Sequence, residues 1–183
     1  MTGRHAVEGL LGAVLLALGC AQPGFGAAQQ CDTGRYALRT PAERFEDHGD
    51  GTLTDRQSRL MWMRCSIGQE WSKDRCTGTL AGQSWAGAQS AAQAINASGR
   101  YFYSDWRVPK ITELATITEP QCENPRINLA VFPDTPAMPY WTATSRTDQS
   151  AANAAYALSF GTEGVQYKNK EEEHYVRLVR TGP

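Results

Sequence analysis

Short apolar segments near both ends of the chain alternate with turn signals and predict antiparallel strands. Asp50-Gly51 lies inside the strand-like stretch 44–55 and favours a type I′ hairpin turn, because that turn needs positive φ at both central positions. A second turn at 56–59 leads into the apolar run 60–63, which predicts a buried strand. Together these segments predict a three-stranded meander at the start of the domain.

Helical spacing follows in the middle of the chain. Ser84 can cap a helix that runs to about residue 98, and Gly99 can end it. A narrow apolar stripe repeats along this segment at Trp85, Ala88, Ala92 and Ile95. A shorter helix is expected at 111–118. The segment 65–76 shows neither the two-residue period of a strand nor the 3.6-residue period of a helix, so we expect an irregular loop there.

The remainder of the chain combines loops with strands. Residues 29–41 are expected to form an irregular lead-in, and 119–139 to form a long ordered loop that carries five of the nine prolines. Further strands are predicted at 140–145, 155–160, 165–168 and 175–180. Strands, two helices, a loop and more strands predict a single α+β domain with helices packed on an antiparallel sheet.

The first residues have the pattern of an export signal. An apolar run covers 9–18, and small residues, Gly26 and Ala28, stand where a signal peptidase needs them. We therefore predict a signal peptide at 1–28, a lead-in at 29–43 and a domain at 44–183. In the alternative interpretation, Leu18-Gly19-Cys20 is a lipobox and Cys20 carries a lipid anchor. Either way the protein is expected to be exported, to the periplasm or beyond, without a transmembrane segment.

Composition narrows the class of partner. The formal net charge is −1, so the net charge does not favour binding to nucleic acid. Four cysteines follow the predicted signal: Cys31, Cys65, Cys76 and Cys122. An even number in an exported chain predicts disulfides. We expect a local Cys65–Cys76 bridge, worth roughly 2–3 kcal/mol, which leaves Cys31–Cys122 as the second.

A series of short motifs follows in order along the chain: Gly51-Thr52-Leu53-Thr54-Asp55, Leu60-Met61-Trp62, Trp85 in an Ala-rich helix, Asp105-Trp106-Arg107-Val108-Pro109, Glu113-Leu114, Tyr140-Trp141-Thr142 and Val176-Arg177-Leu178-Val179-Arg180. This series resembles the Lcl C-terminal domain family, which is named for the end of a bacterial collagen-like adhesin. The resemblance covers about residues 45–180. More distantly, the Trp106 and Arg177 motifs resemble the formylglycine-generating-enzyme fold, a relative of the C-type-lectin fold.

This resemblance implies a loop-rich domain with a carbohydrate-binding or adhesive role. It also implies structural roles for the motif residues Trp62, Trp85, Trp106, Arg107, Glu113, Trp141 and Arg177. Arg107 and Glu113 resemble an ion pair. Trp62, Trp106 and Trp141 have apolar neighbours, so core packing is favoured over sugar stacking.

Signals for catalysis and for metals are weak. Asp47, Asp50 and Asp55 cluster beside His48, but their spacing does not match a calcium loop. His48 and His174 could form a metal site only if the fold brought them together. The formylglycine-generating oxidase uses a late cysteine pair, and no cysteine follows Cys122. We therefore expect no cofactor, no metal and no enzyme activity.

Polar and aromatic residues on loops are the better ligand candidates, because loops on a rigid scaffold commonly carry binding. They are Trp71, Lys73 and Arg75 in the disulfide loop, and Arg146, Asp148, Lys168, Asn169 and Lys170 near the end of the chain. The favoured hypothesis is a glycan- or surface-binding module. The alternatives are an exported metal-dependent enzyme and an assembly subunit that binds an envelope protein. The oligomeric state stays open.

Overall fold

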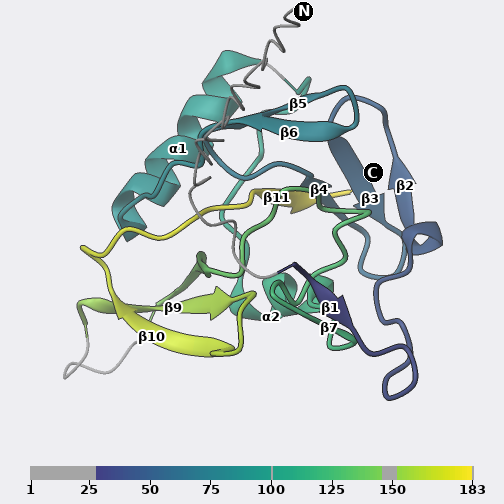
Figure 1. Cartoon of the computed structure of the whole chain (residues 1–183). Coiled ribbons are helices and arrows are strands. Elements are labelled where there is room, and N and C mark those ends of the chain that lie inside the picture. Colours follow the sequence, from purple (N-terminus) through teal and green to yellow (C-terminus); the bar gives the residue numbers. More distant parts are fainter. Residues whose placement is uncertain (1–27, 100, 146–151, 183) are drawn as a thin grey trace, which may run out of the picture.

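The computed structural model describes residues 28–99, 101–145 and 152–182, and two antiparallel sheets organise them (Figure 1). The first sheet has the order β11-β4-β3-β2 and the second the order β10-β9-β8. Their strands are β2 (Phe45–Asp47), β3 (Thr52–Asp55), β4 (Leu60–Met63), β8 (Pro139–Ser145), β9 (Ala154–Ser159), β10 (Val165–Asn169) and β11 (Val179–Thr181). The predicted α+β class is confirmed, and the distant relation to the C-type-lectin-like fold stays a prediction.

The helices lie close to their predicted positions. α1 (Trp85–Ser98) begins at Ser84, whose Oγ accepts a hydrogen bond from the Gly87 N–H at 3.1 Å, and it ends at Gly99 with φ 63°. The second predicted helix divides into α2 (Ile111–Leu114) and the 3-10 turn η2 (Ala115–Ile117). A further 3-10 turn, η1 (Ala42–Arg44), precedes β2.

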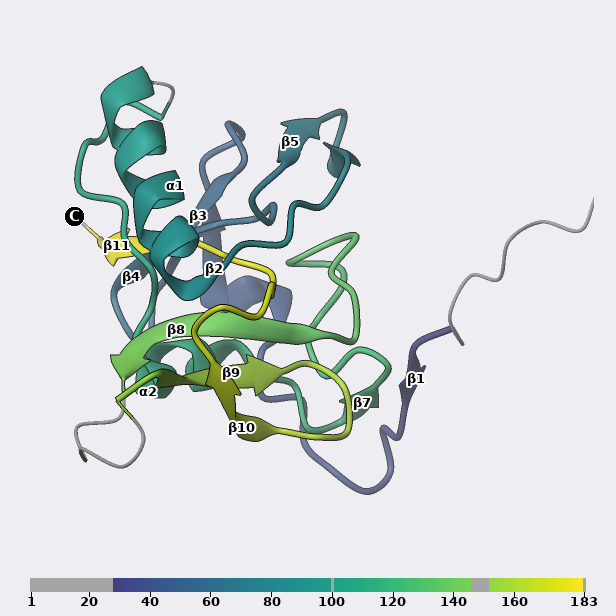
Figure 2. The same cartoon turned by 90° about the vertical axis from the view of Figure 1, so that its left-hand side faces the viewer.

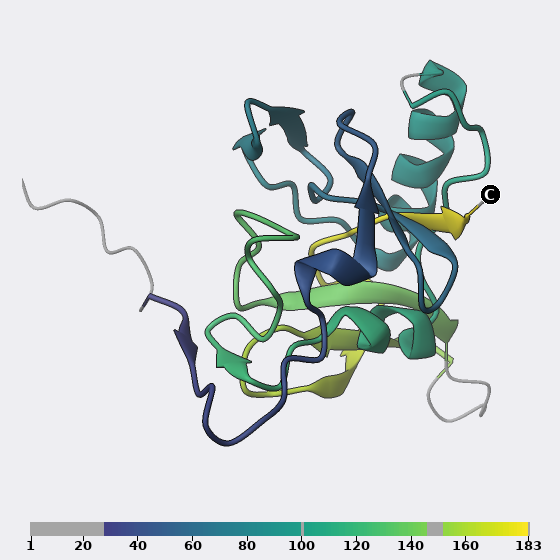
Figure 3. The ribbon, with the colours of Figure 1, turned by 90° about the vertical axis from the view of Figure 1, so that its right-hand side faces the viewer.

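Two buried clusters cover the two faces of the second sheet. Successive strand residues point to opposite faces, so Tyr140 joins one cluster and Trp141 the other. The Tyr140 cluster includes Trp62, Leu114 and Phe132. The Trp141 cluster packs against α1 and the first sheet. Figure 2 shows α1 above β8, and Figure 3 shows α2 on the opposite side.

The disulfide loop contains a hairpin, so the expectation of an irregular loop was wrong. β5 (Gln69–Ser72) pairs with β6 (Arg75–Gly78), and Trp71 lies opposite Cys76. Lys73 and Asp74 form the turn with φ values of 50° and 63°. A turn with positive φ at both central positions is normally recognised in a sequence by Gly or Asn. Neither residue is present at these two positions.

The first hairpin also differs from its prediction. Positive φ occurs at Gly49 and Gly51, and Asp50 between them does not share it. The Asp50 Oδ1 accepts hydrogen bonds from the N–H and the hydroxyl of Thr52, at 2.8 and 2.7 Å. This local side-chain bond competes with the type I′ geometry. The result is a longer turn that still joins β2 to β3.

The last predicted strand is shorter than expected. Only Val179–Thr181 forms β11, which pairs with β4. The segment before it joins the two sheets: Tyr175 O accepts from Trp141 N at 2.9 Å, and Leu178 O accepts from Met63 N at 3.1 Å. Because the segment bonds to both sheets in turn, it extends neither of them over its whole length.

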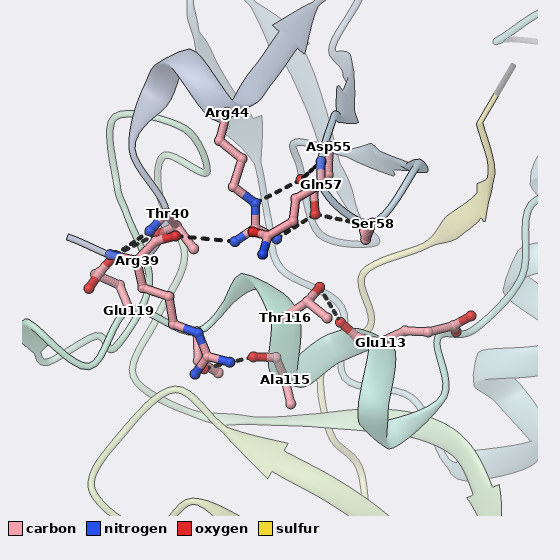
Figure 4. A network of polar contacts seen from close by, with 11 residues as sticks. Arg39, Thr40, Arg44, Asp55, Gln57, Ser58, Glu113, Ala115, Thr116 and Glu119 are labelled. Atoms are coloured by element: carbon pink, nitrogen blue, oxygen red, sulfur yellow. Dashed lines mark hydrogen bonds and ion pairs between the residues drawn. The ribbon is translucent and has the colours of Figure 1, made fainter. Parts of the chain in front are cut away.

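Both expected disulfides are present, Cys31–Cys122 and Cys65–Cys76. The lead-in is more regular than predicted, since β1 (Gln30–Cys31) pairs with β7 (Cys122–Glu123) inside the proline-rich loop. The buried carboxylate of Glu119 also accepts the N–H groups of Arg39 and Thr40 at 2.9 and 2.7 Å (Figure 4). The lead-in is therefore held along its length.

Candidate functional site

An apolar groove of about 300 Å³ lies between α1 and the base of the disulfide hairpin. Figure 2 shows α1 and β5 on the same side of the molecule, away from the β8–β10 sheet. The helix contributes small and apolar side chains, and the segment from β4 to β5 forms the other wall. The lining residues used below are Ser66, Ile67, Gln69, Ala94, Ile95 and Tyr101.

Local backbone requirements build the hairpin wall of the groove. Gly68 has a φ of 93°, and a Cβ there would lie 2.3 Å from Thr79 O. Only glycine fits such a close approach without a shift of the chain. Ile67 N donates to Val176 O at 2.9 Å, which anchors this wall to the core. The turn at Gly68 thus places Gln69 at the groove.

The groove also contains an aromatic ring and an amide. Tyr101 follows α1, and its ring packs edge-to-face on Trp106 with centroids 6.1 Å apart. The Gln69 Oε1 is buried and accepts no hydrogen bond from the described residues. A buried acceptor without a donor costs about 1–3 kcal/mol. The protein itself covers this oxygen, so it is the rest of the Gln69 side chain that faces the groove.

The tip of the hairpin holds the first three predicted ligand residues. Trp71 packs against Gly51, and the Arg64 guanidinium lies 4.0 Å from the centroid of its ring. Arg75 approaches Asp134 to 3.6 Å, and Lys73 is exposed in the turn. The indole of Trp71 therefore packs within the protein, and the cavity lies at the hairpin's base instead of its tip.

Lys168 and Asn169 lie in β10, and Lys170 follows it directly, at the opposite end of the molecule from the hairpin (Figure 1). The Lys170 Nζ donates to Ala152 O at 2.8 Å and lies 4.7 Å from the centroid of the Trp85 ring. Lys168 lines a polar hollow of about 480 Å³. Arg146 and Asp148 fall outside the described residues. Among the residues that the structure describes, the hairpin set and the β10 set are not brought together.

His174 borders the same polar hollow. Burial lowers the pKa of its imidazole, and the carboxylate of Glu172, 3.3 Å away, opposes that shift. The centroid of the His174 ring lies 4.7 Å from the centroid of the Trp141 ring. His48 instead contacts Thr54 at 2.9 Å on the first sheet. Across the described parts of the chain, no three His, Cys, Asp or Glu side chains are placed to hold a metal ion.

The family-like motif residues lie in the core or bind neighbouring segments. Trp62, Trp106 and Trp141 are buried. Trp85 donates from Nε1 to Thr142 O at 2.9 Å. The resulting contacts join α1 and both sheets, which is a structural use of these side chains.

Arg107 and Glu113 form a two-point ion pair, with distances of 2.7 and 2.8 Å. The hydrogen bonds to Glu113 raise the pKa of Arg107. Burial favours a higher pKa for Glu113, but the bonds from Arg107 and the Lys110 N–H outweigh it and lower that pKa. The pair closes the turn between Trp106 and α2.

Sequence reasoning missed the groove residues. Tyr101 belongs to a visible aromatic triplet after the helix, but that triplet has no period that relates it to Gln69. Only the packing of α1 beside the hairpin brings these residues together.

Comparison with known families now adds to the geometry. The sequence model of the Lcl C-terminal domain matches residues 51–180. No curated protein matches the chain. Among the described residues, the structure contains no helix with the length and hydrophobicity needed to cross a membrane.

Proposed function

Because the chain belongs to the Lcl C-terminal domain family, we propose that it is an exported, non-enzymatic binding module that recognises a glycan. Family membership supports a cell-surface or adhesion-related role, and the two disulfides fit an exported protein. The groove between α1 and the disulfide hairpin is the proposed ligand site. The observation that carries the proposal is an apolar groove that is lined by both the aromatic residue Tyr101 and the amide-bearing residue Gln69.

These two groups match the chemistry of a sugar. A pyranose ring presents C–H groups on its faces and hydroxyl donors around its edge, and aromatic side chains suit a surface with both characters. The lining of this groove includes the aromatic residue Tyr101 and the amide-bearing residue Gln69. A rigid wall lowers the entropy lost on binding. The Cys65–Cys76 bridge and the Trp71 packing supply that rigidity.

A second function has an observation of its own. Strand β10 is at the edge of its sheet, and its Val165 and Tyr167 side chains are 54% and 51% exposed. Exposed sheet edges can pair with a strand of another protein. An assembly subunit that binds an envelope protein would use this edge. A metal-dependent enzyme has no comparable support.

Screening the exported protein on a glycan array would test the proposal. We expect capture of at least one glycan, and we expect Gln69→Ala to reduce it at least fivefold. Lys73→Ala at the hairpin tip is the matched control and should bind like the wild type. Binding of no glycan, with capture of one envelope protein that is lost on Tyr167→Lys substitution, would replace the glycan function with assembly.

A further inference from the structure

Two hollows lie near strands β9 and β10, at a distance from the groove proposed for the glycan. The larger has a volume of about 480 Å³ and the smaller about 210 Å³. Four residues line both of them: Met138, Pro139, Glu173 and His174. The hollows therefore adjoin, and the larger one alone has the volume of a small-molecule site. None of their lining residues borders the groove at α1.

Three charged side chains that line these hollows have no ion-pair or side-chain hydrogen-bond partner among the described residues. Lys168, one of the predicted ligand residues, and Glu163 line the larger hollow, and Glu173 lines both. By contrast, the nearby Lys170 and Glu172 each have a partner. Opposite charges thus line one site without pairing with each other.

The imidazole of His174 shows that two of these charges act on the wall of the site. Burial is the main cause that lowers the pKa of His174, and the Lys168 ammonium adds to that effect, whereas the carboxylates of Glu172 and Glu163 oppose it. The lowered pKa leaves the imidazole neutral at pH 7. At that pH the charged groups that line the hollows are therefore two carboxylates and one ammonium.

Glu173 places its carboxylate at the smaller hollow. Its Oε2 lies 3.3 Å from the position that a Cβ would take on Gly82, and Gly82 lines that hollow. Met138 and Pro139 line both hollows, and Met138 is 48% exposed. Methylene chains that end in a cation pack on apolar surface of this kind. The site thus combines charged groups with an apolar strip.

We propose that the two hollows bind a free basic α-amino acid of the lysine type. Such a molecule carries two ammonium groups and one carboxylate, which is the charge complement of the lining. Lys168 binds the carboxylate, Glu163 and Glu173 each bind an ammonium group, and the methylene chain lies along Met138. This inference goes beyond the proposed glycan function, because it concerns a separate site and a different class of ligand.

Each of the three contacts makes a modest contribution to affinity. Glu163 and Glu173 are exposed, and Lys168 is half-buried. Because water screens exposed ion pairs, each contact is expected to strengthen binding by about three- to fivefold. The selectivity for a basic amino acid therefore depends on all three contacts together, and removal of any one charge from the ligand should be measurable.

Three analogues, each without one charged group of lysine, test the contacts. In NMR titrations of the exported protein, L-lysine should give saturable shifts. L-norleucine lacks the side-chain ammonium, Nα-acetyl-lysine lacks the α-ammonium and cadaverine lacks the carboxylate, so each should bind about three- to fivefold more weakly. Affinity equal to that of lysine for any of them would overturn the three-point assignment. An absence of saturable shifts up to about 10 mM lysine would overturn the site.

Two variants assign the contacts to residues. Lys168→Met keeps the stem of the side chain and removes its charge, so it should abolish the preference for lysine over cadaverine. Glu173→Gln should weaken lysine binding about three- to fivefold. Glu171→Gln is the matched control, because it removes the same charge two residues away and lines neither hollow. It should bind lysine like the wild type, and an equal loss in both glutamine variants would show a general charge effect and overturn the inference.

Discussion

Arg177 carries a charge into the core without an ion-pair partner among the described residues. Its Nη1 donates to the carbonyls of Met63 and Arg64, and its Nη2 donates to Thr135 Oγ1 at 2.7 Å. The guanidinium lies 4.8 Å from the centroid of the Phe132 ring. Burial lowers the pKa of Arg177, but an arginine stays protonated in proteins. Carbonyl dipoles and a ring face therefore take the place of a carboxylate.

We expect Arg177→Met to lower the free energy of unfolding by about 2–4 kcal/mol, because buried carbonyls lose their donors. Urea denaturation measures this. Arg56→Met is the control: Arg56 is 64% exposed and 3.8 Å from Glu46, so the loss there should stay below about 0.5 kcal/mol. Similar losses in both variants would contradict the structural role assigned to Arg177.

Asp55 shows how a buried carboxylate can stay ionised. Burial alone would raise its pKa, but hydrogen bonds from Arg44, Ser58 and the Gln57 N–H outweigh burial and lower it. Arg44 contacts both carboxylate oxygens, at 2.7 and 2.5 Å, and also reaches Arg39 O at 3.2 Å (Figure 4). The lead-in and the first sheet are thus connected through one arginine.

The lowered pKa of Asp55 makes stability depend on pH. Its contribution is fully present above the unfolded value, about 3.9, and is lost as pH falls through the lower folded value. Asp55→Asn should therefore be clearly less stable than the wild type at pH 7, and the difference should narrow by pH 3. Denaturant titrations at both values measure it. A difference that stays constant with pH would show that ionisation of Asp55 contributes nothing.

At the scale of elements, local signals explain α1 and fail for the β5–β6 hairpin. Ser84 and Gly99 mark the ends of α1 in the sequence and cap it in the structure. The hairpin turn instead places Lys73 and Asp74 at positive φ. This conformation is imposed by pairing, the disulfide and the contact of Trp71 with Gly51, none of which a local pattern reveals.

Replacing the turn with Lys73→Asn and Asp74→Gly should raise the free energy of unfolding by about 0.5–1 kcal/mol, because these residues favour positive φ. Thermal and urea unfolding of the oxidised protein would show it. Lys73→Val is the contrasting variant, and it should destabilise because a β-branched residue resists that φ. A destabilised Asn-Gly variant would mean that the turn is not of this type.

At the scale of the whole molecule, the two disulfides act over different distances. Cys65–Cys76 closes a short loop beside the groove, with a sequence separation of 11 residues. Cys31–Cys122 spans 91 residues and attaches the lead-in to the proline-rich loop. In the chain-entropy view the longer loop stabilises more, about 4–5 kcal/mol against about 3. The second bridge therefore contributes more to stability, and the first to the shape of the proposed site.

Mass spectrometry of the unreduced, exported protein should find no free thiol at these four positions, and peptide maps should show the Cys31–Cys122 and Cys65–Cys76 links. The same sample should accept an alkylating label at all four after reduction. Two or more labelled cysteines before reduction would contradict the disulfide framework.

The sequence by itself determined the family, the α+β class, the ends of α1 and the cysteine framework. Each of these depends on features that can be read along the chain: the order of motifs, the spacing of apolar residues, the capping residues, and the number and spacing of cysteines. Export remains a prediction from the same source. Only the tertiary structure decided that Tyr101 and Gln69 share a groove and that Trp71 packs beneath Arg64. It also decided that the β5–β6 hairpin and β10, with the ligand candidates they carry, lie at opposite ends of the molecule. These relations arise from packing between segments distant in the chain, and no periodicity or spacing within either segment encodes them.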